Sequence, residues 1–176
     1  RLLERRVEEL DEAKFPVPCS RRNAPLVFDA KHKVFVLFGG DHEDYLMNDT
    51  WILDLAKRSW RRVDADTAPN PRAGHALVYL PKSRKIALYE GYVQSDSTDY
   101  GAPTYTARDP VELWLFDVGG ERWDLGGNWP LPNRKQTSGL APVGRFHGYA
   151  AQFFAPPPLA ADADDTLVLA APRTVS

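Results

Sequence analysis

Four consecutive residues form the densest group of side chains that could bind a cation or move a proton. They are Asp41, His42, Glu43 and Asp44, three carboxylates around one imidazole. Carboxylate oxygens and an imidazole nitrogen are ligands that divalent metals accept. The spacing matches neither an EF-hand loop nor a zincin helix, and no paired histidine accompanies it. We therefore interpret the segment as a solvated turn whose Asp41, His42 and Asp44 are candidate binding residues, and we predict no metal and no cofactor.

The other reactive side chains do not form a catalytic motif. Cys19 is the only cysteine, which excludes an internal disulfide and a cysteine-based zinc site. The sequence has no G-x-S-x-G nucleophile elbow and no P-loop, and its Gly-Gly pairs are typical of turns. Asp162, Asp164 and Asp165 are paired carboxylates of the kind that acid–base catalysis uses, but a charged loop has the same composition. The sequence leaves catalysis open and favours a non-enzymatic role.

Composition narrows the class of protein. Of 176 residues, 43% are hydrophobic and 26% are charged, which is typical of a globular chain. Five Trp, seven Tyr and 15 Pro are the residues of strands and turns. The formal net charge is −2 and no cluster of Lys and Arg stands out, so we predict no nucleic-acid partner. No apolar run approaches the roughly 18 residues that a membrane span requires.

Short apolar runs separated by turns begin near residue 24. They occupy residues 26–28, 34–38, 50–55 and 60–63. The connections between the first and second runs and between the third and fourth runs are tight. Four such runs predict one antiparallel sheet of four strands, a to d.

The same order of runs then returns. Leu77-Val78-Tyr79 repeats Leu26-Val27-Phe28 at a spacing of 77 − 26 = 51 residues. Trp114 follows Trp51 at the larger spacing of 114 − 51 = 63 residues, so 12 extra residues lie between strands b and c of the second unit. A third unit opens at residues 145–150, and its second strand is predicted at 166–169. A repeat of about 50 residues is typical of propeller blades.

These motifs resemble the kelch repeat of galactose-oxidase-like β-propellers. The residues that carry the resemblance are Gly39-Gly40, Asn48-Asp49-Thr50-Trp51, Asp54, Trp60 and Pro71-Arg72-Ala73-Gly74-His75. The second unit departs from the pattern, because it has Glu90-Gly91 in place of Gly-Gly and no Asn-Asp before Trp114. The resemblance covers about residue 22 to the end. It implies an all-β fold of kelch blades, about two and a third of them, in an incomplete ring.

The resemblance also sets the expected organisation. Residues 1–18 are an N-terminal helix and linker, 19–63 are one blade, 64–126 are a blade with a long b–c insertion, and 127–176 are part of a third. Leu3, Val7 and Leu10 form the narrow apolar stripe of the short helix, which either packs on the propeller rim or continues a coiled coil from upstream. We expect further blades from flanking sequence or from another chain.

Long loops are expected on one face. In a four-stranded meander the b–c and d–a loops emerge together, and here they span residues 41–48, 64–71, 92–110 and 124–144. One further long loop, 155–165, is expected on the opposite face. The insertion at 92–110 carries Tyr92, Tyr100 and Tyr105 among small polar residues, a composition found in paratopes. An ordinary surface insertion is the alternative. Arg108 in this insertion and Trp129 in the last of the four loops complete the candidate binding residues.

Two kinds of function follow from the resemblance. The leading hypothesis is a binding module that presents the long-loop face to a protein or peptide. The alternative is a propeller enzyme, specifically a fragment of a copper-radical oxidase, a family that needs a Cys–Tyr crosslink, a second Tyr and two His ligands. A third possibility is a structural segment of a large extracellular or envelope protein.

Overall fold

The computed structural model describes residues 16–42, 45–99, 102–107, 111–129 and 159–169. All regular secondary structure in these segments is β-strand, which confirms the all-β prediction. In the same segments, no helix has the length and apolarity to cross a membrane. The N-terminal helix expected at residues 1–14 lies outside the described residues.

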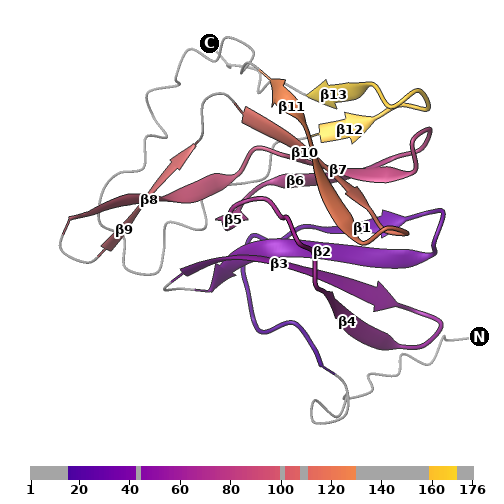
Figure 1. Ribbon diagram of the computed structural model, residues 1–176, viewed down its shortest axis with the longest axis horizontal. Coiled ribbons are helices and arrows are strands. Elements are labelled where there is room, and N and C mark those ends of the chain that lie inside the picture. Colours follow the sequence, from indigo (N-terminus) through magenta and orange to yellow (C-terminus); the bar gives the residue numbers. More distant parts are fainter. Residues whose placement is uncertain (1–15, 43–44, 100–101, 108–110, 130–158, 170–176) are drawn as a thin grey trace, which may run out of the picture.

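Two four-stranded antiparallel sheets dominate the structure (Figure 1). Sheet 1 contains β1 (Leu26–Asp29), β2 (Val34–His42), β3 (Tyr45–Asp54) and β4 (Ser59–Val63), paired in chain order. Sheet 2 contains β6 (Ala76–Leu80), β7 (Lys85–Tyr89), β10 (Val111–Asp117) and β11 (Arg122–Trp129), again paired in chain order. The two predicted meanders are therefore present.

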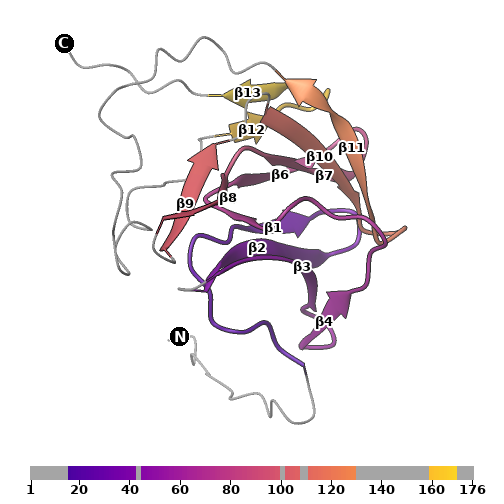
Figure 2. The ribbon, with the colours of Figure 1, turned by 60° about the vertical axis from the view of Figure 1, so that its left-hand side comes forward.

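Two smaller sheets complete the described part. Sheet 3 is the antiparallel pair of β12 (Leu159–Ala161) and β13 (Leu167–Leu169). The hairpin sheet contains β5 (Arg72–Ala73), β8 (Tyr92–Asp99) and β9 (Ala102–Ala107), in the order β5-β8-β9. Figures 1 and 2 show sheets 1, 2 and 3 stacked face to face in chain order.

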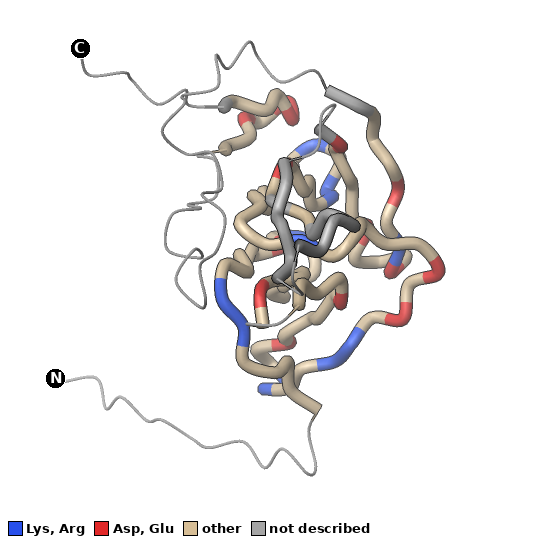
Figure 3. The backbone as a smooth tube through the Cα atoms, turned by 90° about the vertical axis from the view of Figure 1, so that its left-hand side faces the viewer, with Lys and Arg blue, Asp and Glu red and all other residues tan. Residues whose placement is uncertain are grey.

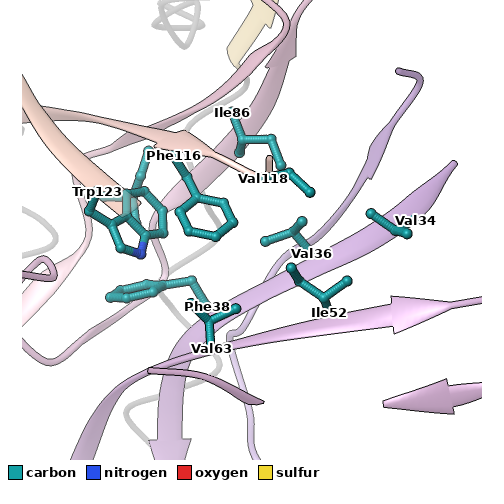
Figure 4. Close-up of a cluster of buried hydrophobic side chains, with 10 residues drawn as sticks. Val34, Val36, Phe38, Ile52, Val63, Ile86, Phe116, Val118 and Trp123 are labelled. Carbon is teal, nitrogen blue, oxygen red and sulfur yellow. The ribbon is translucent and has the colours of Figure 1, made fainter. Parts of the chain in front are cut away.

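The main core lies between sheets 1 and 2 (Figure 4). Sheet 1 contributes Val36, Phe38 and Ile52, and sheet 2 contributes Phe116 and Trp123, all at most 3% exposed. The ring of Trp123 packs 5.0 Å from that of Phe38 and 4.8 Å from that of Phe116. Each such buried side chain contributes roughly 1.5–3 kcal/mol to stability. The apolar alternation of the strands therefore holds the two sheets together.

One polar bond crosses this core. The indole Nε1 of Trp123 donates a hydrogen bond of 2.9 Å to the hydroxyl Oγ1 of Thr50, and both side chains are buried. A buried donor that lost this acceptor would cost about 1–3 kcal/mol. The bond therefore favours one position of sheet 2 on sheet 1.

An arginine clamps strands b and c of sheet 1. Arg21 donates from Nη1 to the carbonyl oxygen of Gly39 at 2.9 Å and to the Asp49 carboxylate at 2.6 Å. The same carboxylate accepts a hydrogen bond from the indole of Trp51. We call this group of bonds the arginine clamp. It ties the segment before β1 to residues within β2 and β3.

The clamp recurs in sheet 2. Arg72 donates to the carbonyl oxygen of Glu90 at 3.2 Å and to the Glu112 carboxylate at 3.0 Å. The indole of Trp114 donates to the same Glu112 oxygen at 3.0 Å. Glu112 thus does for sheet 2 what Asp49 does for sheet 1, although the sequence pattern before Trp114 differs.

Backbone conformation explains the Gly-Gly pair and its replacement. Gly39 and Glu90 share a left-handed φ of 56° and 59°. A Cβ on Gly39 would lie 2.6 Å from the carbonyl oxygen of Arg72 and 2.8 Å from that of Met47, closer than side chains tolerate. Gly40 and Gly91 also have positive φ, 114° and 95°. Glycine is therefore required at Gly39 by the two backbone oxygens, because Glu90 shows that a side chain can be placed at this φ.

Sheet 3 differs from the expected loop at residues 155–165. Leu159–Ala161 pairs with Leu167–Leu169, so part of that segment is strand. The turn narrows to the residues after Ala161, where the Asp162 carboxylate accepts hydrogen bonds from the backbone N–H groups of Asp164 and Thr166 at 2.9 Å each. Aspartate caps a tight turn in this way, which the Pro- and Asp-rich composition did not distinguish from a loose loop. The expected opening of the third unit at residues 145–150 lies outside the described residues.

Candidate functional site

The two ends of the stacked sheets differ in how their strands are joined. We call the end with the β1–β2, β3–β4, β6–β7, β10–β11 and β12–β13 connections the turn end. Here Asp54 accepts hydrogen bonds from the backbone N–H groups of Ala56 and Lys57 at 3.0 and 3.1 Å. Asp117 caps the β10–β11 turn in the same way. Short, capped turns leave little adaptable surface at this end.

The opposite end, which we call the hairpin end, carries the β8–β9 hairpin. β8 pairs with β9 through Val93 and Thr106, and β5 pairs with β8 through Arg72 and Val93. Val93 is only 6% exposed, so the base of the hairpin is anchored in the protein. The expected loop at residues 92–110 is therefore a strand pair for most of its length. Its Ser, Thr and Asp residues lack the apolar alternation that would have predicted strands.

The β2–β3 connection at the hairpin end is also tighter than expected. Asp41 pairs with Leu46 and His42 with Tyr45, so the strands continue past the bulge at Gly39-Gly40. The backbone of Asp41 also exchanges two hydrogen bonds of 2.9 Å with Arg22. Asp41 is consequently buried, at 7% exposure, and the expectation that it lies in a solvated turn is wrong.

A stacked aromatic pair marks the end of this connection. The ring of His42 lies parallel to that of Tyr45, with centroids 5.0 Å apart and an interplanar angle of 22°. Tyr45 is 48% exposed, so about half of its side chain is open to solvent. Figures 1 and 2 both place this connection on the same side as the β8–β9 hairpin. An exposed aromatic surface and a projecting hairpin therefore share the hairpin end.

The remaining candidate residues are placed only in part. Tyr92 begins β8 opposite Ala107, and Tyr105 lies in β9 opposite Gln94. Trp129 ends β11 opposite Val111. Asp44, Tyr100 and Arg108 lie outside the described residues. A binding role for these side chains stays a prediction.

The arginine clamp of sheet 1 contains a largely buried ion pair, Arg21 with Asp49. Burial alone would raise the pKa of Asp49, but hydrogen bonds from Arg21 and Trp51 outweigh it and hold that pKa below its usual value. The carboxylate therefore stays ionised beside Arg21 at neutral pH. The clamp therefore holds two strands of sheet 1 to the segment before β1.

His75 is a buried titratable group beside the second clamp. Its side chain is fully buried and packs edge-on against Phe38, with ring centroids 5.5 Å apart. Burial, and secondarily the charge of Arg72, lower its pKa from 6.5 to about 3. His75 is therefore neutral at physiological pH and is part of the core. Arg72 beside it anchors the neighbouring loops through hydrogen bonds to the carbonyl oxygens of Asn70 and Glu90.

The part of the chain that the structure describes contains no assembled set of metal ligands. No group of three or more His, Cys, Asp or Glu side chains converges there. Cys19 Sγ lies 3.6 Å from the thioether sulfur of Met47 and 3.5 Å from the guanidinium of Arg21. Along the described tube, Lys and Arg are interspersed with Asp and Glu (Figure 3).

Sequence reasoning missed two residues that matter here. Tyr45 gave no signal beyond its place after the acidic cluster, and its exposure depends on the length of β2 and β3. Glu112 does not match the motif of the first unit, which has Asp two residues before the tryptophan. A carboxylate of either length at that position is the signal that identifies it.

Comparison with solved structures supports a β-propeller-like fold. YjhT, a kelch-type propeller-like protein, superposes with a TM-score of 0.50 over 63% of this chain, at 18% sequence identity. The chain spans 38% of that protein.

Comparison with known sequences gives a shorter match. A putative adagio-like protein 2 from Oryza sativa subsp. japonica is 44% identical over 59 residues, which are 32% of this chain and 9% of the rice protein. The chain therefore spans less than a tenth of that curated relative. No protein-family model matches the chain.

Proposed function

We propose that this chain is part of a kelch-type propeller that acts as a binding module for a protein or peptide. The observation that carries the proposal is the β8–β9 hairpin, which stands at the hairpin end on a sheet anchored by buried Val93. Recognition commonly resides on segments that project from a rigid scaffold. Fold alone does not determine function, so the proposal depends on this surface.

Repetition of the arginine clamp supports the kelch assignment. Arg21 and Arg72 are 51 residues apart, as are Gly39 and Glu90, whose carbonyl oxygens they bind. Each arginine precedes strand a of its sheet and binds a carbonyl oxygen in strand b, for Gly39, or directly after it, for Glu90. We interpret sheets 1, 2 and 3 as successive blades, with sheet 3 incomplete in the described residues.

The proposed binding surface combines the hairpin with its neighbours at the same end. Its candidate residues are Asp41, His42, Asp44, Tyr92, Tyr100, Tyr105, Arg108 and Trp129. Tyr45 adds an exposed ring stacked on His42. Tyrosine side chains supply rigid, amphipathic contact area at a low entropic cost, which suits recognition of a polypeptide.

The test is to shorten the hairpin without disturbing its base. Gln94 and Tyr105 are directly paired, so an Asn-Gly turn inserted between them replaces residues 95–104. We expect the shortened protein to unfold at the same temperature as the wild type and to lose the partner that the wild type captures. The matched control is Lys57→Ala with Arg58→Gly in the β3–β4 turn at the opposite end, which should keep that partner.

Partners are first identified by mass spectrometry of proteins retained by the immobilised wild-type chain. Each one is then measured against both variants by surface plasmon resonance. A partner that binds the shortened hairpin with unchanged affinity would place recognition elsewhere and contradict the proposal.

A further inference from the structure

One face of sheet 1 is equivalent to the face of sheet 2 that packs on sheet 1, and it is exposed in part. Its Leu37 is only 8% exposed, whereas two side chains of β1 are more than a third exposed. Sheet 2 packs on sheet 1 through the side chains of Ile86, Leu88 and Phe116, all fully buried. The repeat spacing of 51 residues before the insertion and 63 after it places Phe35, Leu37 and Leu53 at the equivalent positions of sheet 1. We call this side of sheet 1 its open face, because in the described part of the chain no other sheet covers it.

Exposure on the open face is concentrated on β1, an edge strand of sheet 1. Leu26 is 49% exposed and Phe28 is 39% exposed, and both lie on β1. Their counterparts in sheet 2, Leu77 and Tyr79, pack against the main core. At the turn end, Leu55 is 52% exposed, whereas its counterpart Val118 is 5% exposed. Three large apolar side chains on one face are more than the isolated surface hydrophobics that need no explanation.

Sheet 3, the last sheet of the stack, offers a matching surface on its outer face. Leu159, Ala161 and Leu167 of sheet 3 pack against sheet 2. Because side chains alternate along a strand, Ala160 and Val168 point away from sheet 2. Val168 is 53% exposed. Sheet 3 therefore presents a small apolar face formed by its two strands, whereas Leu26 and Phe28 of sheet 1 both lie on β1.

Charge favours a contact between the open face of sheet 1 and the outer face of sheet 3. The β12–β13 turn is acidic, with Asp164 81% exposed at its side chain. The β1–β2 turn is basic, with Lys31 and Lys33 exposed, and the Lys33 ammonium lies 6.0 Å from the centre of the Phe28 ring. In a continued stack these two turns would lie side by side, because each joins strands a and b.

The contact between sheets 2 and 3 shows how such turns meet. The Asp165 carboxylate accepts hydrogen bonds from the backbone N–H groups of Lys82 and Ser83 at 2.8 and 2.7 Å. The Lys82 ammonium lies 3.4 Å from the Asp164 carboxylate. Neighbouring a–b turns in this chain are therefore already joined by lysine and aspartate.

We propose that the open face of sheet 1 binds sheet 3 of a second copy of this chain, head to tail. The contact joins two different surfaces, so it either closes into a ring or continues as an open array. It buries Leu26 and Phe28 against Ala160 and Val168, and it places Lys33 beside Asp164 of the neighbouring copy. This proposal does not depend on the binding role of the hairpin end.

Light scattering after size exclusion, over a series of protein concentrations, tests the proposal. We expect the wild-type mass to exceed that of a monomer and either to stay at one ring size or to rise with concentration. Phe28→Asp should raise the dissociation constant at least about tenfold, because it places a charge in the apolar contact. The control Leu125→Asp, at a residue 54% exposed on sheet 2, should associate like the wild type.

A charge exchange keeps the test independent of folding defects. Lys33→Glu alone and Asp164→Lys alone should each weaken self-association. An equimolar mixture of these two variants should restore it, because the contacts between unlike copies pair either the two wild-type residues or the two exchanged ones. A wild-type chain that stays monomeric, a Phe28→Asp variant that associates normally, or a mixture that does not recover would each overturn the proposal. A monomeric wild type would assign the open face to a blade of different sequence.

Discussion

Acid should destabilise this protein through one buried histidine. The pKa of His75 is lowered to about 3 in the folded chain, against 6.5 when exposed, chiefly because its ring is fully buried. As pH falls below 6.5, the unfolded chain takes up a proton at this site and the folded chain does not. Stability is therefore complete above pH 6.5 and falls as the pH approaches 3.

The size of the effect follows from the proton count. One proton taken up only by the unfolded state changes the free energy of unfolding by about 1.4 kcal/mol per pH unit. Between pH 7.5 and pH 5 the loss from His75 is about 2 kcal/mol. This is a substantial part of the roughly 5–15 kcal/mol by which domains are stable.

The assay compares the wild type with His75→Leu by urea unfolding at several pH values and constant ionic strength. Leucine keeps an apolar contact with Phe38 and cannot be protonated. Other acid-sensitive groups, including Asp49, are present in both proteins, so their contributions cancel in the difference. We expect the variant to gain about 2 kcal/mol on the wild type between pH 7.5 and 5. A difference that does not change with pH would refute the neutral, buried state of His75.

Two further substitutions test the sheet contact and the glycine pair. Thr50→Val removes the acceptor of the buried Trp123 indole and should lower the free energy of unfolding by about 1–3 kcal/mol, whereas Thr50→Ser should keep most of it; urea unfolding at pH 7.5 measures both. Gly39→Ala should cost about 2–4 kcal/mol, because its Cβ would meet the Arg72 and Met47 carbonyl oxygens. Exposed Gly120→Ala is the matched control in the same assay, and equal losses in the two glycine variants would contradict the steric argument.

The main sheets could be predicted because their residues repeat. Apolar runs in register, with Trp51 and Trp114 at equivalent places, located both four-stranded sheets and the insertion between β7 and β10. The arginine clamp could not be deduced, because nothing in the sequence links Arg21 to Asp49 across 28 residues. In sheet 2 the carboxylate of the clamp belongs to Glu112. Its longer side chain reaches the equivalent arginine and tryptophan, but glutamate does not match the Asn-Asp motif of the first unit.

The hairpin end was less predictable than the sheets. A polar segment such as residues 92–110 can be loop or hairpin, and its pairing depends on contact with β5, which is only two residues long. The burial of Asp41 likewise depends on a backbone bridge to Arg22, a contact between residues distant in the sequence. Local composition carries no information about either contact.

The arginine clamp has a consequence for how this protein can change. It closes strands b and c at the point where they leave the sheet, between the Glu90 carbonyl and the Glu112 carboxylate in sheet 2. The 12 additional residues of the second unit lie between those two residues, and buried Val93 anchors the base of that segment. Each clamp therefore marks an insertion site, where a new segment between strands b and c costs little folding free energy. Mutation can rebuild the surface of one blade while leaving the others, and the stack itself, as they are.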